Sequence, residues 1–176
     1  MFKLTRYLEG GYEFDFGAVQ VEKLDSEGRS LPIGMSFVDF VVYEESRTIL
    51  IEVKDPSQKG ATAKEREEFL RQIQQNTLIN ESLVPKGRDS YTYLHLMNQI
   101  RRRLLYIVIL GMEKYDESFD SALILGFQDR LRQRLNKETE VPWKIKYIDD
   151  VLVLTTEKWS EVFPNYKISR PGNKPT

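Results

Sequence analysis

The spacing of hydrophobic residues changes along the chain, from short strand-like runs at the start to helix-like periods later. Runs rich in β-branched and aromatic residues predict strands, because such side chains pack well on a pleated sheet. The predicted strands cover residues 12–16, 18–24, 37–43 and 48–54. The polar stretch at residues 25–30 predicts a turn, and Pro56 ends the last of these strands.

Helical periodicity begins after Pro56 and then alternates with strands. The predicted helices, in which apolar residues recur on one face, cover residues 64–83, 88–104 and 118–135. We expect Pro85 to break or open a helix, because proline has no backbone N–H to donate. The continuous apolar run at residues 105–110 predicts a central buried strand, and residues 143–154 predict another.

This order of elements is typical of one α/β domain with a mixed β-sheet. We assign that domain to residues 1–165 and see no repeat or linker that divides it. Thr156 is expected to cap a short last helix. Residues 166–176 are polar and contain two prolines, so we expect a flexible C-terminal tail.

Composition narrows the functional classes. The 176 residues include no cysteine, which excludes disulfides and thiolate metal sites within them. No apolar run approaches about 18 residues, and Met1–Arg6 lacks the apolar stretch of a secretion signal, so we expect a cytoplasmic protein without a membrane partner. The net charge of −1, from 26 basic and 27 acidic residues, argues against a protein that coats nucleic acid. An enzyme that meets nucleic acid through one local patch and a bound cation stays compatible with it.

Three charged residues lie in strands that are otherwise apolar, where charges are rare unless they are paired or bind metal. If the strands form a hairpin about Glu45–Ser46, opposed residue numbers sum to 91, and Asp39 faces Glu52. Opposed Cβ atoms lie about 4.5–5.5 Å apart, and a divalent cation between the two acids would turn repulsion into attraction. Lys54 projects from the same face. The alternative is a surface hairpin with a solvated ion-pair cluster, which would also expose several large apolar side chains.

The stretch Val38-Asp39-Phe40 followed by Ile51-Glu52-Val53-Lys54 resembles the second and third core strands of the PD-(D/E)XK nuclease superfamily. One departure is Val38, which stands where the motif has proline. The resemblance implies a restriction endonuclease-like core, a mixed β-sheet flanked by helices. It also implies Mg²⁺- or Mn²⁺-dependent hydrolysis of DNA, with RNA not excluded, in repair, recombination or defence.

The resemblance also assigns roles. Asp39, Glu52 and the carbonyl of Val53 would hold the metal ion, and Lys54 would orient the attacking water. Glu13 could supply the further acid that many members carry on a first helix. Glu9, Asp15 and Asp25 compete with it for that role. Cutting both strands of a duplex would favour a homodimer.

The segment Lys86-Gly87-Arg88-Asp89-Ser90 is similar to a stretch found in some small bacterial proteins of the superfamily. At the start of a helix, Lys86 and Arg88 could hold a phosphate. In the alternative interpretation, Asp89 caps the helix and both cations are solvated.

Other side chains and other functions compete with this hypothesis. His95 is the single histidine, so a Ser-His-Asp triad would have to use it and is not expected. The arginines at positions 130, 132 and 134 are interpreted as the exposed side of an amphipathic helix. The rival functions are a nuclease-fold domain that binds nucleic acid or protein without turnover, and an unrelated α/β protein in which the hairpin is coincidental.

Overall fold

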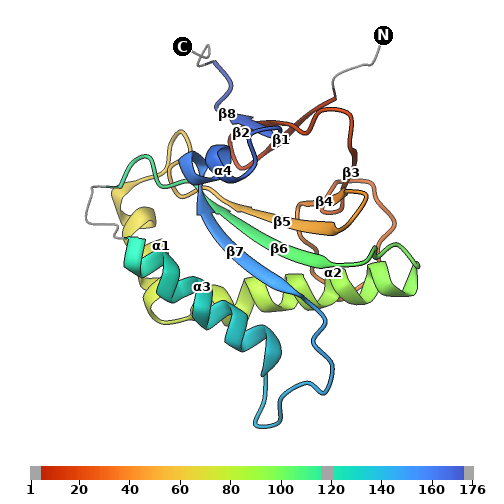
Figure 1. Cartoon of the computed structure of the whole chain (residues 1–176). Helices are drawn as coiled ribbons and strands as arrows, with labels where there is room; N and C mark the ends of the chain where they lie inside the picture. Colours follow the sequence, from red (N-terminus) through yellow and green to blue (C-terminus); the bar gives the residue numbers. More distant parts are fainter. Residues whose placement is uncertain (1–4, 116–120, 173–176) are drawn as a thin grey trace.

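The computed structural model describes residues 5–115 and 121–172, and a five-stranded mixed sheet runs through its centre (Figure 1). The strands are β3 (Gln20–Lys23), β4 (Phe40–Tyr43), β5 (Thr48–Lys54), β6 (Leu104–Leu110) and β7 (Asp150–Thr155), which are neighbours in that order. β3, β4 and β5 pair antiparallel, whereas β5, β6 and β7 pair parallel. The chain is therefore a mixed α/β fold, as predicted. The endonuclease-like core within that class stays a prediction.

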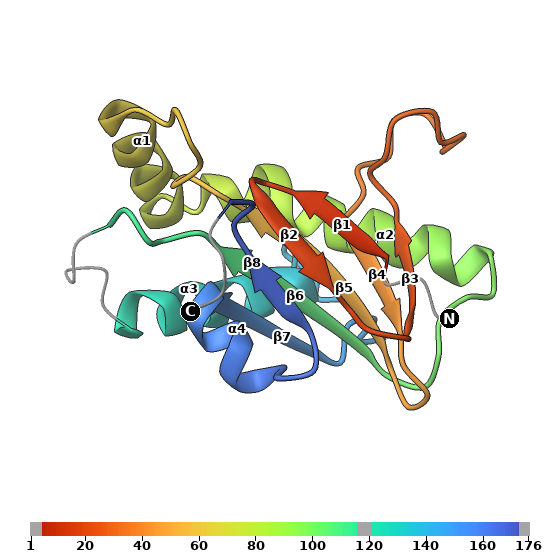
Figure 2. The same ribbon diagram turned by 90° about the horizontal axis from the view of Figure 1, so that it is seen from above.

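Two further layers cover the central sheet, one on each face. Below it in Figure 1 lie α1 (Ala63–Gln74), the π-helix η1 (Ile79–Leu83), α2 (Val84–Leu96) and α3 (Ser121–Asn136). Above it lie α4 (Thr156–Val162) and a small antiparallel sheet of β1 (Arg6–Glu9), β2 (Tyr12–Asp15) and β8 (Lys167–Ser169), which Figure 2 shows from above. No described helix is long and apolar enough to span a membrane.

Alternate residues of the central strands enter two separate hydrophobic cores. In β5, Leu50 packs in the helix-side core, whereas Ile49 and Ile51 pack against the small sheet and α4. All seven residues of β6 are buried, as expected for a continuous apolar run covered on both faces. A charged side chain at position 52 must therefore enter the helix-side layer, because it shares the face of Leu50.

The helical region differs from the prediction. Pro85 does not break a helix but stands in the first turn of α2, as the alternative that it opens a helix predicted, and the five-residue π-helix η1 ends directly before α2. A wider turn at this point accommodates a residue that has no N–H to donate. The break comes earlier, at Asn76, which adopts a left-handed backbone with φ of 61°. The predicted helix over 88–104 is also displaced, since α2 ends at Leu96 and β6 begins at Leu104.

The C-terminal prediction was wrong in part. β8 lies within the expected flexible tail and pairs with β2, so the tail does not begin at residue 166. Residues 143–149 do not belong to a strand, and Trp143 and Ile145 are exposed there. The last helix is capped by Thr155 rather than Thr156, because the Thr155 hydroxyl accepts a hydrogen bond from the Lys158 amide.

Candidate functional site

The β4–β5 hairpin has the predicted register. Val41 pairs with Leu50, and Phe40 pairs with Ile51, so the residue numbers sum to 91. Asp39 directly precedes β4, and continuing the register places it opposite Glu52. Asp39 is 4% exposed and Glu52 is 1% exposed. Among the described residues, Asp39 and Glu52 are the two charged residues that are buried as whole residues. Charged residues are rarely fully buried, and the hairpin places these two side by side.

Asp39 is fixed by the backbone of the neighbouring strand. Its Oδ2 atom accepts a hydrogen bond of 2.7 Å from the Val53 amide, and its own carbonyl accepts one of 2.9 Å from the Leu24 amide. The carboxylate therefore holds the open end of the hairpin together. Its second oxygen, Oδ1, faces the Lys86 ammonium at 3.9 Å.

Two ammonium groups converge on Glu52. The Nζ atoms of Lys54 and Lys86 both lie 2.8 Å from Glu52 Oε1, and Lys86 is also 3.0 Å from Oε2. Lys54 comes from β5 itself, as predicted, and its side chain is 24% exposed. Lys86 reaches the site from α2. The four side chains form what we call the carboxylate site: Asp39, Glu52, Lys54 and Lys86.

Asp39 is the less completely neutralised of the two acids. Burial, followed by repulsion from Glu52, raises the pKa of Asp39 to about 7, although Lys86 and the Val53 amide act in the opposite direction. Burial alone would lower the pKa of Lys86, but attraction by Glu52 and Asp39 outweighs it and raises that pKa. The site thus holds an ammonium firmly while one of its carboxylates stays easy to protonate.

The segment from Lys86 to Ser90 has a role that the sequence did not reveal. Asp89 Oδ2 accepts a 2.9 Å hydrogen bond from the Ser36 amide, and Ser90 Oγ accepts one of 3.0 Å from the Val38 amide. These bonds attach the chain leading into Asp39 to the middle of α2. Gly87 allows the close approach, because a Cβ atom there would lie 3.0 Å from Tyr106 Cε1.

The phosphate prediction for Lys86 and Arg88 loses its structural premise. α2 begins at Val84 and follows η1 without interruption, so neither residue lies at a free helix N-terminus. Lys86 points into the carboxylate site instead. Arg88 is paired with Glu138 at 2.5 Å and with Asp89 at 3.1 Å. Asp89 is consequently not a helix cap.

The further acid is not placed where the sequence suggested. Glu13 lies in β2, where it pairs with Arg6 at 3.0 Å, and among the described residues no contact joins it to Asp39 or Glu52. Two of its competitors come closer. Asp25 lies 3.7 Å from the Lys86 ammonium, and Glu9 contributes to the raised pKa of Asp39. No local sequence signal separates these acids, because their positions depend on how the N-terminal strands fold over the sheet.

The donor chemistry fits a hard divalent cation. Such ions bind carboxylate and carbonyl oxygens, and Mg²⁺ often takes only one or two carboxylates from the protein. Asp39 Oδ1 receives no hydrogen bond in the described part of the chain, and Glu52 already binds cationic charge. The described residues contain no group of three or more acidic, histidine or cysteine side chains arranged for a metal. Asp39 and Glu52 are thus the two acidic side chains that the described part of the site offers to a cation.

Comparison with known protein families, curated proteins and solved structures finds no match to the chain.

Proposed function

We propose that the chain is a nuclease that hydrolyses phosphodiester bonds, with DNA as the expected substrate, RNA as the alternative, and Mg²⁺ or Mn²⁺ as cofactor. The observation that carries the proposal is the buried, facing pair of Asp39 and Glu52, in which one oxygen of Asp39 receives no hydrogen bond from the described residues. Retaining two such acids in a core is costly unless a ligand uses them. The resemblance to the PD-(D/E)XK superfamily supports the same reaction.

Each residue has a definite task in this proposal. Asp39, Glu52 and the Val53 carbonyl would hold the metal ion, which supplies a Lewis acid for the scissile phosphoryl group. Lys54 is partly exposed, so its ammonium can orient water and offset charge that develops on the phosphate. The attachment of residues 36–38 to α2 keeps Asp39 in register with Glu52 while substrate binds.

Lys86 gives the site a second state. Its ammonium contacts both oxygens of Glu52, so it stabilises the acids when no divalent cation is bound. A divalent ion would compete with Lys86 for Glu52, because both would bind the same carboxylate oxygens. Displaced from Glu52, the Lys86 ammonium is available for a substrate phosphate.

The test is cleavage of single- and double-stranded DNA and RNA with Mg²⁺ or Mn²⁺. Asp39→Asn, Glu52→Gln and Lys54→Met should each reduce cleavage by at least about 100-fold, as loss of a charge-stabilising group does. Glu161→Gln is the matched control, since Glu161 is an exposed partner of Lys158. Cleavage that persists at wild-type rates in all three variants would refute the proposal.

A second candidate function follows from Lys86. Because this ammonium already partners both acids, the chain is also compatible with a nuclease-fold domain that binds nucleic acid or protein without turnover. That candidate predicts no cleavage by the wild type on any of these substrates. It also predicts no binding of Mn²⁺ by calorimetry.

A further inference from the structure

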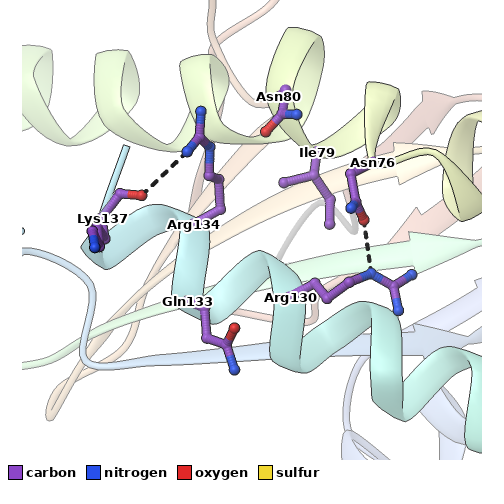
Figure 3. A pocket seen from close by; sticks show the side chains of 7 residues that line it. All are labelled: Asn76, Ile79, Asn80, Arg130, Gln133, Arg134 and Lys137. Carbon is purple, nitrogen blue, oxygen red and sulfur yellow. Dashed lines mark hydrogen bonds between the residues drawn. The ribbon is translucent and has the colours of Figure 1, made fainter. Parts of the chain in front are cut away.

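A polar cavity lies on the helix side of the sheet, away from the β4–β5 hairpin. It has a volume of about 470 Å³ and is formed between the segment that contains η1 and helix α3 (Figure 3). We call it the α3 pocket. Apart from Ile79, its lining is polar, with three amide side chains and three cations. A volume in this range suits a small ligand or a short stretch of a polymer.

Among the residues that the structure describes, the cations of the α3 pocket have no acidic partners. They are Arg130, Arg134 and Lys137, and in the described part of the chain none lies within ion-pair distance of a carboxylate. Arg132, on the same helix but outside the pocket, pairs with two acids, Asp129 and Asp150. In a chain with slightly more acids than bases, this separation leaves about three positive charges on one cavity.

One wall of the pocket is already ordered. Arg130 donates a 2.7 Å hydrogen bond from Nε to Asn76 Oδ1 and one of 3.3 Å to the Ile73 carbonyl. The left-handed backbone of Asn76 turns this side chain toward α3. Arg130 is therefore held in place, and its remaining N–H groups are available to a ligand.

The other lining groups are ready donors. Asn80 and Gln133 make no side-chain hydrogen bond within the described residues, and Lys137 Nζ has no partner there. A simpler explanation for the cations is that Arg134 and Lys137 offset the helix dipole at the C-terminal end of α3. That explanation does not account for Arg130, which lies nearly two turns earlier, or for the three amide side chains that line the same cavity.

We propose that the α3 pocket binds clustered phosphate groups, either consecutive phosphates of a nucleic-acid strand or those of a small polyphosphate. Arginine, lysine and side-chain amides all present N–H donors, and uncompensated cations draw phosphates by electrostatics and counterion release. The pocket contains none of the residues of the carboxylate site. The continuous helix formed by η1 and α2 connects the two regions, because it begins beside Asn80 and carries Lys86.

Binding measured in chelator separates this inference from catalysis. The probes are inorganic pyrophosphate, followed by calorimetry, and a labelled 12-nucleotide single-stranded DNA, followed by fluorescence anisotropy. The pocket variant is Arg134→Gln with Lys137→Gln, since both side chains are exposed. The matched control is Arg102→Gln with Arg103→Gln, an equal charge change at exposed positions.

We expect the pocket variant to weaken binding on the order of 10-fold and to lower the salt dependence, whereas the control changes it by less than about twofold. A loss confined to pyrophosphate identifies a small polyphosphate as the ligand, and a loss confined to the DNA identifies a strand. Gln133→Glu should weaken binding as well, which guards against misfolding of the double variant. If neither probe binds the wild type, or if the pocket variant binds like the control, the inference is wrong.

Discussion

Two acidic clusters lie at the same end of β5 and are built in opposite ways. Asp55, directly after β5, has a side chain that is 1% exposed, and Arg170 donates to both of its oxygens at 2.8 Å. The Ser57 amide adds a third hydrogen bond at 3.1 Å. Glu52, three residues earlier, shares the Lys86 ammonium with Asp39, and no arginine of the described residues binds it. One cluster is fully satisfied, whereas the other keeps an oxygen without a donor.

The residues around Asp55 are closely packed and hold its partner Arg170 in place. A Cβ atom at Gly111 would lie 2.4 Å from both Asp55 Oδ1 and the Tyr12 hydroxyl, so no side chain fits there. Arg170 also stacks over the Tyr12 ring at 4.1 Å and donates to Glu113 at 2.9 Å. The comparison teaches that burial of an acid alone does not mark a functional site. The distinguishing feature is the incomplete neutralisation seen in the carboxylate site.

The largest effect is expected from breaking the satisfied cluster. Arg170→Ala leaves the Asp55 carboxylate buried without its counter-charge, so we expect the free energy of unfolding to fall by about 2–4 kcal/mol. Urea denaturation with an unchanged slope measures it. Arg6→Ala is the control, since the pair of Arg6 and Glu13 is exposed and should contribute about 0–1 kcal/mol. A loss of unfolding free energy no larger than that of the control would show that the ion pair of Arg170 and Asp55 does not stabilise the fold.

A comparable gain is expected when the unsatisfied cluster receives a cation. With Mn²⁺ at 100 times its dissociation constant, ligand binding stabilises the folded state by about 2.7 kcal/mol, and thermal unfolding reports it. Asp39→Asn and Glu52→Gln should abolish the stabilisation, whereas Arg170→Ala should keep it. Equal stabilisation of all variants would place the cation elsewhere.

The sequence predicted the part of the site that depends on local pairing. A tight hairpin fixes register, and period-two alternation fixes the face, so Asp39, Glu52 and Lys54 could be brought together from residue numbers alone. The fold class followed from the order of elements in the same way. Lys86 was identified as a candidate cation, but its contact with Glu52 was not predicted, because it depends on how α2 crosses the sheet.

Long-range packing also explains the remaining errors. β8 has only three residues, and it forms because β2 and Arg170 hold it, which no local pattern reveals. The π-helix η1 ends directly before α2, so Pro85 opens α2 without a gap in the helix before it. The α3 pocket was likewise hidden, because its arginines have the spacing of an ordinary exposed helix face.

The smallest effect on the free energy of unfolding is expected when the same substitution, Asp to Asn, is made in each of the two clusters. It is also the most direct test of the difference between them. In chelator at pH 8, Asp39→Asn should raise the free energy of unfolding on the order of 1–2 kcal/mol, because the ionised carboxylate is disfavoured in the fold. Asp55→Asn should lower it, since it removes the charge that Arg170 binds. Urea denaturation of the three proteins across a pH series measures both changes.

The pH dependence of the Asp39→Asn gain has a definite sign. Burial and repulsion from Glu52 raise the pKa of Asp39 from 3.8 to about 7, so folding of the wild type favours the protonated acid. The wild type therefore loses stability relative to the variant as pH rises above 3.8, and the difference reaches its full size above about pH 7. Below pH 3.8 the carboxyl is neutral in both folded and unfolded states, and the difference should vanish. A gain that does not change with pH would mean that Asp39 is as well neutralised as Asp55, which would remove the reason to expect a ligand at the carboxylate site.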